Sequence, residues 1–253
     1  MKKAQSVALV GAGPISHSAL LRMSNLRHSL GPVKASSLRL ASRIVNRIRA
    51  GYPVDSYGQF EKADVVLIWV PDRMAASIVE ELASSGLNWD GRTVILHSPK
   101  LDSNLLSALA ERGAATASFC DVDGVQSRLF IGEGDKRAVA DLDRLLASDE
   151  LDLIALRPGK KPLFLASRTL AGEMVLKLIH GAVESLRVSG LTMREALPIV
   201  ETWVEATLRA YLRAGRKAPG IHSETDDAEL AEQAAALAEA LPELAPLMAG
   251  LRR

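Results

Sequence analysis

The sequence predicts an α/β fold, in which a doubly wound parallel sheet is followed by a C-terminal all-helical domain. Short apolar runs alternate with helical stretches through the first 157 residues, and this alternation is typical of parallel sheets. The first apolar run, Ser6–Val10, leads directly into a glycine-rich turn. From Leu163 onward the periodicity is helical, and we find no convincing strand.

The elements of the first domain follow from this alternation. The run Asp64–Val70 is almost continuously apolar, which is typical of a central parallel strand buried on both faces. Asp135 marks the start of the helix that we expect over Lys136–Ala147. The other predicted strands are Ser6–Val10, near Val33–Ser36, Thr93–Leu96, Ala115–Phe119, Leu129–Gly132 and Leu151–Leu156, and the other predicted helices are Pro14–Leu26, Leu38–Ala50, about Met74–Ser84 and Asn104–Arg112.

A domain boundary is predicted near Pro158–Pro162, which gives a sheet domain over residues 1–157 and a helical domain over residues 163–253. Leu163–Ser189 is long enough for a single helix of roughly 40 Å at about 1.5 Å per residue. A helix of that length usually buries one face against a partner chain, so we expect this helix to contact another chain. Thr192 and Glu195 form a capping box for the next helix, to about Ala214, and Asp226–Leu241 predicts an alanine-rich last helix.

Composition excludes several classes of partner. The 253 residues carry a net charge of +1, which argues against binding driven by charge to nucleic acid or to an anionic membrane. Aromatic residues make up only 4%, too few for the stacking platforms that bind bases. The one cysteine, Cys120, allows no internal disulfide, and neither a signal peptide nor a membrane-spanning run is apparent. These features predict a cytoplasmic protein.

The turn after the first strand resembles a dinucleotide-binding loop with one glycine replaced. Gly11 suits the tight turn, Gly13 lets the backbone approach a pyrophosphate, and the following helix would direct its N-terminal dipole at the negative charge. Ser16 occupies the position of the third glycine, and Pro14 removes one amide donor. The alternative is a strand-to-helix turn that binds nothing. The predicted pyrophosphate loop comprises Gly11, Ala12, Gly13, Pro14, Ile15 and Ser16.

The residues after the second predicted strand favour NADP over NAD. A carboxylate there would bind the ribose 2′-hydroxyl of NAD, but the segment Lys34–Arg39 contains none. Ser36, Ser37 and Arg39, with Arg43 one turn further on as an alternative to Arg39, could instead hold a 2′-phosphate. The competing interpretation is a solvated helix start capped by serine.

Two further strand ends supply candidate residues. Val70 and Pro71 would border the cofactor's ribose, and Asp72 is expected to cap the next helix. His97 is the best acid/base candidate, because the imidazole pKa lies near neutrality, and Ser98 beside it could orient a substrate. A structural histidine next to a buried strand is the alternative.

The segment from Ser118 to Gly124 places a thiol and two carboxylates after another predicted strand. We interpret Asp121 to Gly124 as turn chemistry rather than as a metal site, since no further cysteine or clustered histidine supplies a ligand spacing. No metal is therefore predicted.

The order of these parts resembles that of predicted oxidoreductases with an N-terminal NADP-binding Rossmann domain and a C-terminal helical domain, relatives of pyrroline-5-carboxylate reductase in the 6-phosphogluconate dehydrogenase superfamily. The resemblance extends over nearly the whole chain. Its motifs are Gly11–Gly13, Asp64–Val66 to Val70–Asp72, His97–Ser98, Glu133–Asp135 and Ala218–Asp226.

The resemblance implies a Rossmann-fold homodimer whose long helices pack together, with NADP as cofactor. This chain departs from the family's pattern at three places: Ser16 in the loop, Cys120-Asp121 in place of a His-Pro pair, and Gly172-Glu173 in place of a Ser-Asn pair. The leading hypothesis is an NADP-dependent oxidoreductase that transfers hydride to or from a small carbonyl or imine. The alternative is a non-catalytic dimer that serves as a nucleotide sensor or scaffold, and a methyltransferase is disfavoured by the helical tail and by the missing acid after the second strand.

Overall fold

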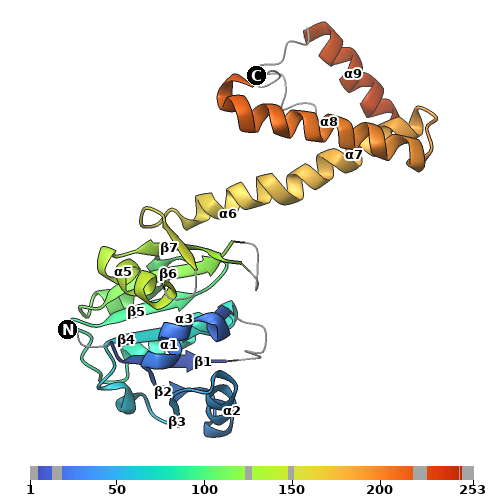
Figure 1. Ribbon diagram of the computed structural model, residues 1–253. Coiled ribbons are helices and arrows are strands. Elements are labelled where there is room, and N and C mark those ends of the chain that lie inside the picture. Colours follow the sequence, from blue (N-terminus) through green and yellow to red (C-terminus); the bar gives the residue numbers. More distant parts are fainter. Residues whose placement is uncertain are drawn as a thin grey trace. The chain divides into compact units, whose positions relative to one another are not determined.

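The computed structural model describes residues 5–12, 19–122, 127–147, 151–218, 227–244 and 246. It divides into two compact units, Met1–Leu165 and Ala166–Arg253. The first unit holds the sheet and the second is helical over its described residues (Figure 1). None of the described helices is both long enough and apolar enough to cross a membrane.

The sheet has eight strands in the order β3-β2-β1-β4-β5-β6-β7-β8, which confirms the predicted α/β fold. From β3 to β6 all neighbours are parallel, whereas β7 runs antiparallel to β6 and β8 runs parallel to β7. Figure 1 shows β7 near the top of the sheet and β3 at the bottom. The strands are β1 (Val7–Gly11), β2 (Leu30–Lys34), β3 (Tyr52–Val54), β4 (Val65–Trp69), β5 (Thr93–His97), β6 (Ala115–Asp121), β7 (Leu129–Gly134) and β8 (Asp152–Ala155).

Helices cover both faces of this sheet because its central strands are apolar on both sides. On one face α1 (Ser24–Ser29), α2 (Leu38–Ile48) and α5 (Lys136–Leu146) pack against side chains such as Leu67 and Phe119. On the other, α3 (Asp72–Ala83), α4 (Ser107–Ala110) and the 3₁₀ turn η2 (Tyr57–Phe60) cover residues such as Val66 and Leu96.

Two predicted helices of this unit are interrupted in the structure. The described part of the predicted helix Pro14–Leu26 is a 3₁₀ turn, η1 (Ala19–Arg22), followed by the short α1. The predicted helix Asn104–Arg112 is a 3₁₀ turn, η3 (Ser103–Leu106), continued by α4.

The long helix that the sequence predicts is present with one irregular turn, and its first residues belong to the first unit. The helical run begins at Lys161 as α6 (Lys161–Thr169), passes through a π-helical turn, η4 (Leu170–Met174), and continues as α7 (Val175–Val188). The Thr192–Glu195 capping box is present at the start of α8 (Met193–Ala214). A 3₁₀ turn, η5 (Gly215–Lys217), follows α8, and α9 (Asp227–Ala240) lies beside α7.

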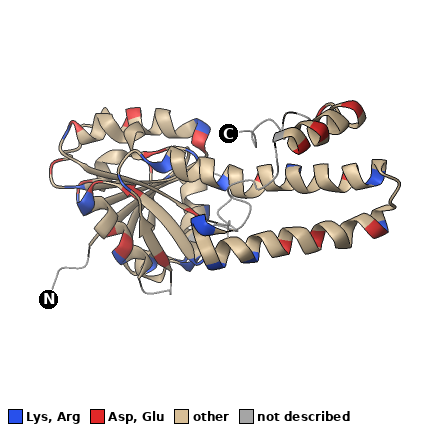
Figure 2. Cartoon of the chain, turned by 90° about the horizontal axis from the view of Figure 1, so that it is seen from above, with Lys and Arg blue, Asp and Glu red and all other residues tan. Residues whose placement is uncertain are grey.

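Charges of both signs are spread over the helices around the sheet, as Figure 2 shows, while α9 carries acidic residues and no basic ones. This distribution agrees with the small net charge of +1.

Candidate functional site

The strand order reverses at the carboxyl ends of β1 and β4, which lie side by side. β2 lies on one side of β1 in the sheet, and β4, which comes later in the chain, lies on the other side of β1. Gly11 pairs with Trp69, and the Ala12 amide donates a hydrogen bond to the Trp69 carbonyl at 3.1 Å. In open α/β sheets ligands bind in the crevice at such a reversal.

Only the first two residues of the predicted pyrophosphate loop are described, since Gly13, Pro14, Ile15 and Ser16 lie outside the described residues. Gly11 is buried and Ala12 is half-buried. The Ala12 amide already bonds to Trp69, so donors for a phosphate would have to come from later amides of the loop.

The residues predicted to hold a 2′-phosphate lie just beyond β2. Ser36, Ser37 and Arg39 are all exposed, and Arg39 is in the first turn of α2. Ser37 is the N-cap of α2, and its Oγ accepts a hydrogen bond from the Leu40 amide at 3.2 Å. The capping interpretation is therefore confirmed for Ser37, while Ser36 and Arg39 face solvent at the helix N-terminus, where an anion is favoured.

An aromatic cluster forms where β4, β5 and β6 end. Trp69 pairs with His97 and His97 pairs with Phe119 in the strand register, so the three side chains are cross-strand neighbours. The Trp69 and His97 rings are stacked, with centroids 3.7 Å apart and planes 1° from parallel, and Phe119 meets the imidazole edge-on at 5.1 Å. His97 is the last residue of β5 rather than the first after it. These contacts fix the plane of the His97 ring.

The Nε2 atom of His97 has no hydrogen-bond partner among the described residues, although it is buried. The nearest charged atom is Asp121 Oδ2 at 3.8 Å, a distance too long for a hydrogen bond. Burial lowers the pKa of His97, and the nearby Asp121 carboxylate opposes this shift. Buried nitrogens without partners are rare and call for an explanation.

Ser98 lies on the opposite face of the sheet from His97, as strand alternation requires. It is fully buried, and its Oγ donates to Asp72 Oδ1 at 2.6 Å and accepts from the Leu101 amide at 2.8 Å. The two predicted catalytic side chains are thus separated by the sheet.

Asp72 was expected to cap α3, and this expectation is wrong. Pro71 is the N-cap residue, and the Asp72 carboxylate in the first turn instead holds the hydroxyl of Ser98. Val70 is buried and Pro71 half-buried at the end of β4, beside the strand reversal.

A buried lysine within the predicted domain boundary, Pro158–Pro162, lies beneath the loop after β5. Lys161 is fully buried, and its Nζ donates to the Ser98 carbonyl at 2.5 Å, the Leu101 carbonyl at 2.8 Å and Ser118 Oγ at 2.8 Å. Burial lowers the pKa of Lys161.

The buried carboxylate of Glu133 binds two segments on the same side of the sheet, the 3₁₀ turn η3 and the residues just before α6. Glu133 accepts hydrogen bonds from the Ser103 amide, the Ser103 hydroxyl and the Gly159 amide. The bond from Gly159 to Glu133 therefore fixes the residues before α6 to the sheet, and the bonds of Lys161 fix the first residue of α6. In the sequence, the only indication of the buried Glu133 and Lys161 was that charged residues stand near the ends of apolar runs.

The predicted turn over Asp121 to Gly124 begins one residue later than expected, because Asp121 is still the last residue of β6. Cys120 is buried. Asp123 and Gly124 lie outside the described residues. Within the described ranges, no group of three or more His, Cys, Asp or Glu side chains could hold a metal ion.

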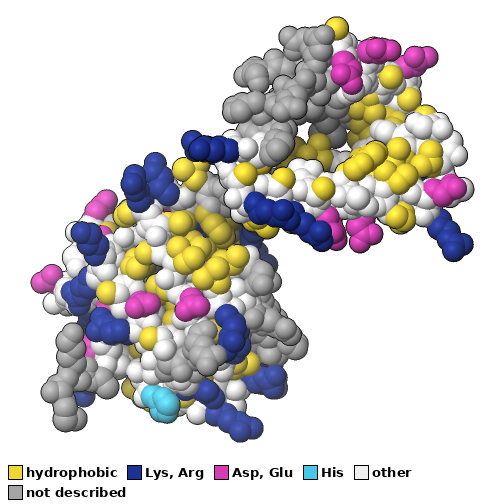
Figure 3. Space-filling view, turned by 45° about the horizontal axis from the view of Figure 1, so that its top comes forward, with side chains coloured by type: hydrophobic (Ala, Val, Ile, Leu, Met, Phe, Trp, Pro, Cys, Tyr) yellow, Lys and Arg dark blue, Asp and Glu magenta, His cyan; other side chains and the backbone are white. Residues whose placement is uncertain are grey.

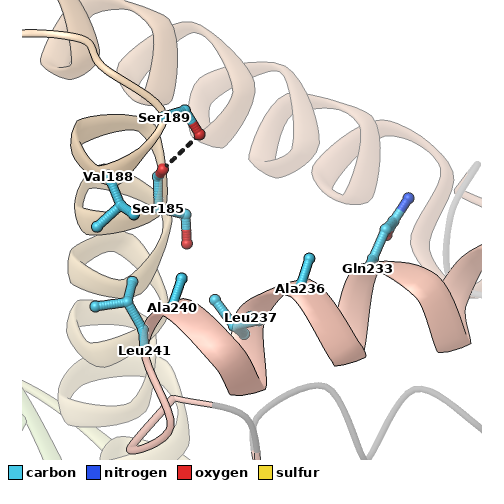
Figure 4. A pocket seen from close by; sticks show the side chains of 8 residues that line it. All are labelled: Ser185, Val188, Ser189, Gln233, Ala236, Leu237, Ala240 and Leu241. Atoms are coloured by element: carbon cyan, nitrogen blue, oxygen red, sulfur yellow. Dashed lines mark hydrogen bonds between the residues drawn. The ribbon is translucent and has the colours of Figure 1, made fainter.

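The helical unit contains a separate hollow of about 430 Å³ between α7 and α9 (Figure 4). No residue in its lining carries a formal charge, and the serine hydroxyl of Ser189 is bonded to the Ser185 carbonyl at 2.8 Å. The lining residues are Ser185, Val188, Ser189, Gln233, Ala236, Leu237, Ala240 and Leu241. The titratable and aromatic groups gather at the sheet edge instead, so that edge is the candidate site.

Solved structures share this fold at low sequence identity. A candidate NADP oxidoreductase from Bacteroides fragilis is 13% identical, with a TM-score of 0.71, over 98% of this chain and 95% of that protein. An imine reductase from Bacillus cereus is 17% identical, with a TM-score of 0.67, over 98% and 92%. A reductive aminase from Aspergillus terreus, in complex with NADPH and ethyl levulinate, is 16% identical, with a TM-score of 0.60, over 99% and 93%. No protein-family model and no curated protein sequence matches the chain.

Proposed function

We propose that the protein is an NADP-dependent oxidoreductase that transfers hydride to or from a small carbonyl or imine substrate. The main observation behind the proposal is the reversal of strand order at the carboxyl ends of β1 and β4. The stacked ring of His97 lies at the carboxyl end of β5, the next strand along the same edge of the sheet. The shared fold with an imine reductase and with a reductive aminase solved with NADPH supports the same reaction class.

The cofactor roles follow the geometry of the edge. Gly11 and Ala12 begin the pyrophosphate loop, with Gly13, Pro14, Ile15 and Ser16 as its remaining members. Ser36, Ser37 and Arg39 lie where the adenosine 2′-phosphate would be held, and the exposed guanidinium of Arg39 suits a phosphate. Val70 and Pro71 border the ribose.

The catalytic role belongs to His97, which protonates the substrate, while Ser98 positions the loop after β5 through its bonds to Asp72 and to the Leu101 amide. NADPH supplies the hydride when it is bound. The ring of Trp69 covers one face of the imidazole, and Trp69 and Phe119 together keep the imidazole in one plane.

A titration with NADPH and NADH tests the cofactor assignment. We expect NADPH at about 100 times its dissociation constant to stabilise the native protein by about 2.7 kcal/mol, measured as a rise in melting temperature. NADH should stabilise less, because it lacks the 2′-phosphate. Arg39→Ala should reduce the advantage of NADPH over NADH, whereas Arg112→Ala, which removes an exposed arginine after α4, should leave it unchanged.

Failure of both nucleotides to raise the melting temperature at millimolar concentration would reject the oxidoreductase and favour a scaffold. Stabilisation by NADPH with no turnover across a panel of carbonyl and imine substrates would favour a nucleotide sensor.

We infer that the protein is a homodimer and that its helical unit forms the interface. Large apolar side chains are exposed along α7 and α8, and Figure 3 shows apolar side chains gathered on these helices. Patches of this kind mark association surfaces in soluble proteins. The exposed residues are Val175, Leu176, Leu178, Val188, Met193, Leu197, Trp203, Leu208, Tyr211 and Leu212.

Sedimentation at micromolar concentration should show a dimer, and Leu176→Glu should shift the population to monomer because the new charge would be desolvated in the interface. Ile154→Glu is the matched control, since Ile154 is an exposed apolar residue of the sheet unit. A wild-type protein that sediments as a monomer, or an equal effect of the two variants, would contradict the interface.

A further inference from the structure

The His97 ring is held in place, yet the atom that could carry its second proton is unpaired. Trp69 stacks on one face of the imidazole and Phe119 meets it edge-on, which fixes the ring plane. Within the described residues, Nε2 is buried and makes no hydrogen bond. A buried polar atom without a partner costs free energy, so a side chain held this way indicates a group that acts on a ligand.

Asp121 is the carboxylate that faces this nitrogen. It lies two residues beyond Phe119 on β6, so its side chain points to the same face of the sheet. Its Oδ2 lies 3.8 Å from Nε2, and the two side chains retain 15% and 20% exposure. The pair is therefore close enough for electrostatic attraction, and both side chains remain partly exposed although Nε2 itself is buried.

Charged groups from three elements act on the imidazole. Burial lowers the pKa of His97, and the Lys161 ammonium at the start of α6 lowers it further. Asp121 on β6 raises this pKa, and so does Asp72 in the first turn of α3. Among these groups, Asp121 contributes most to raising the pKa of His97, and it is therefore the main group that opposes the lowering that burial causes.

We propose that Asp121 is a positioning residue that stabilises the protonated form of His97, from which Nε2–H donates the proton in reduction. The inference rests on the proposed function. As hydride adds to the carbon of the C=O or C=N bond, the π electrons of that bond take the proton, the Nε2–H bond breaks, and an O–H or N–H bond forms. The imidazole is left neutral, and it takes its next proton from water. Trp69 contributes because a cation over an indole face is favoured.

The first test measures the His97 titration directly and needs neither cofactor nor substrate. The ring signal of His97 is followed by NMR against pH in the full chain, and it is identified as the signal lost in His97→Gln. In Asp121→Asn the midpoint should move to lower pH, because the imidazolium loses its nearest opposite charge. Asp121→Glu restores a carboxylate and should return the midpoint toward the wild-type value.

The matched control is Asp143→Asn, which removes an exposed carboxylate of α5 and changes the net charge equally. This control should leave the His97 midpoint in place. Thermal unfolding of each variant verifies that it is folded. A midpoint that is unchanged in Asp121→Asn, or that moves as far in Asp143→Asn, overturns the pairing.

The second test links the pair to turnover with NADPH and a small cyclic imine. Wild-type kcat/KM should fall as pH rises through the pKa of His97, since only the imidazolium donates, and Asp121→Asn should shift this fall to lower pH. His97→Gln should lose about 10²–10⁴-fold in rate. A wild-type protein without turnover rejects the proposed function, and an active protein whose pH profile is unmoved in Asp121→Asn rejects the inference.

Discussion

Gly134→Ala is expected to destabilise the protein by about 3–5 kcal/mol, a large part of the stability of an ordinary domain. Gly134 ends β7 with φ +132°, a conformation that side chains disfavour. An added Cβ would collide with the Thr116 carbonyl oxygen and lie 2.6 Å from the Ala117 Cα. Both atoms belong to the backbone of β6, which is paired on both sides and has no room to move.

Gly86→Ala separates steric collision from backbone preference. Gly86 also has a positive φ, +75°, but an added Cβ there would meet nothing within 4 Å. Its loss should be only about 1 kcal/mol, from the backbone conformation alone. Urea unfolding followed by circular dichroism measures both variants, and equal losses would show that the β6 contact does not govern the Gly134 effect.

Lys161→Met should destabilise the protein by about 2–4 kcal/mol. Methionine matches the length of the lysine stem but donates no hydrogen bond, so the carbonyls of Ser98 and Leu101 and the hydroxyl of Ser118 would lose their shared donor. Lys160→Met is the control, because Lys160 is the exposed neighbour, and it should change stability by no more than about 0.5 kcal/mol.

The pH dependence of the same variant gives an independent check. The pKa of Lys161 is lowered in the folded state from its usual 10.5, so between the two values the unfolded chain binds more protons. The wild-type free energy of unfolding should therefore gain a contribution that grows as pH rises toward 10.5. Lys161→Met lacks this contribution, so the stability gap between the two proteins should widen over that range. A gap independent of pH would contradict a buried, titrating ammonium group.

Buried parallel strands could be predicted closely because they are apolar on both faces. The runs around Val65–Trp69 and Thr93–His97 have no polar interruption, and each was placed to within about one residue. β3 was missed because Tyr52–Val54 is only three residues long and contains a proline. The reversed direction of β7 has no signature in hydrophobic periodicity, since parallel and antiparallel strands share a period of two.

A residue of the candidate site could be predicted from the sequence only where its residue type alone is distinctive. His97 was found because an imidazole at a strand end is distinctive, but its partners follow from register, which sets Trp69 and Phe119 on either side of it. Lys161 resembled a linker residue because lysines beside glycine and proline are usually exposed. Lys161 is buried because oxygen atoms of Ser98, Leu101 and Ser118 accept its hydrogen bonds. These three residues lie far from Lys161 in the sequence, so no local pattern predicts that they meet it.

The buried ammonium group of Lys161 also bears on where the chain can be divided. A fragment that ends at residue 157, the predicted end of the sheet domain, would omit the side chain that ties together the loop after β5 and the centre of β6. It would also omit the Gly159 amide that bonds to Glu133. A fragment that extends to Leu165 retains both groups. The compact sheet unit therefore includes the first residues of the long helix, and these residues complete its interior.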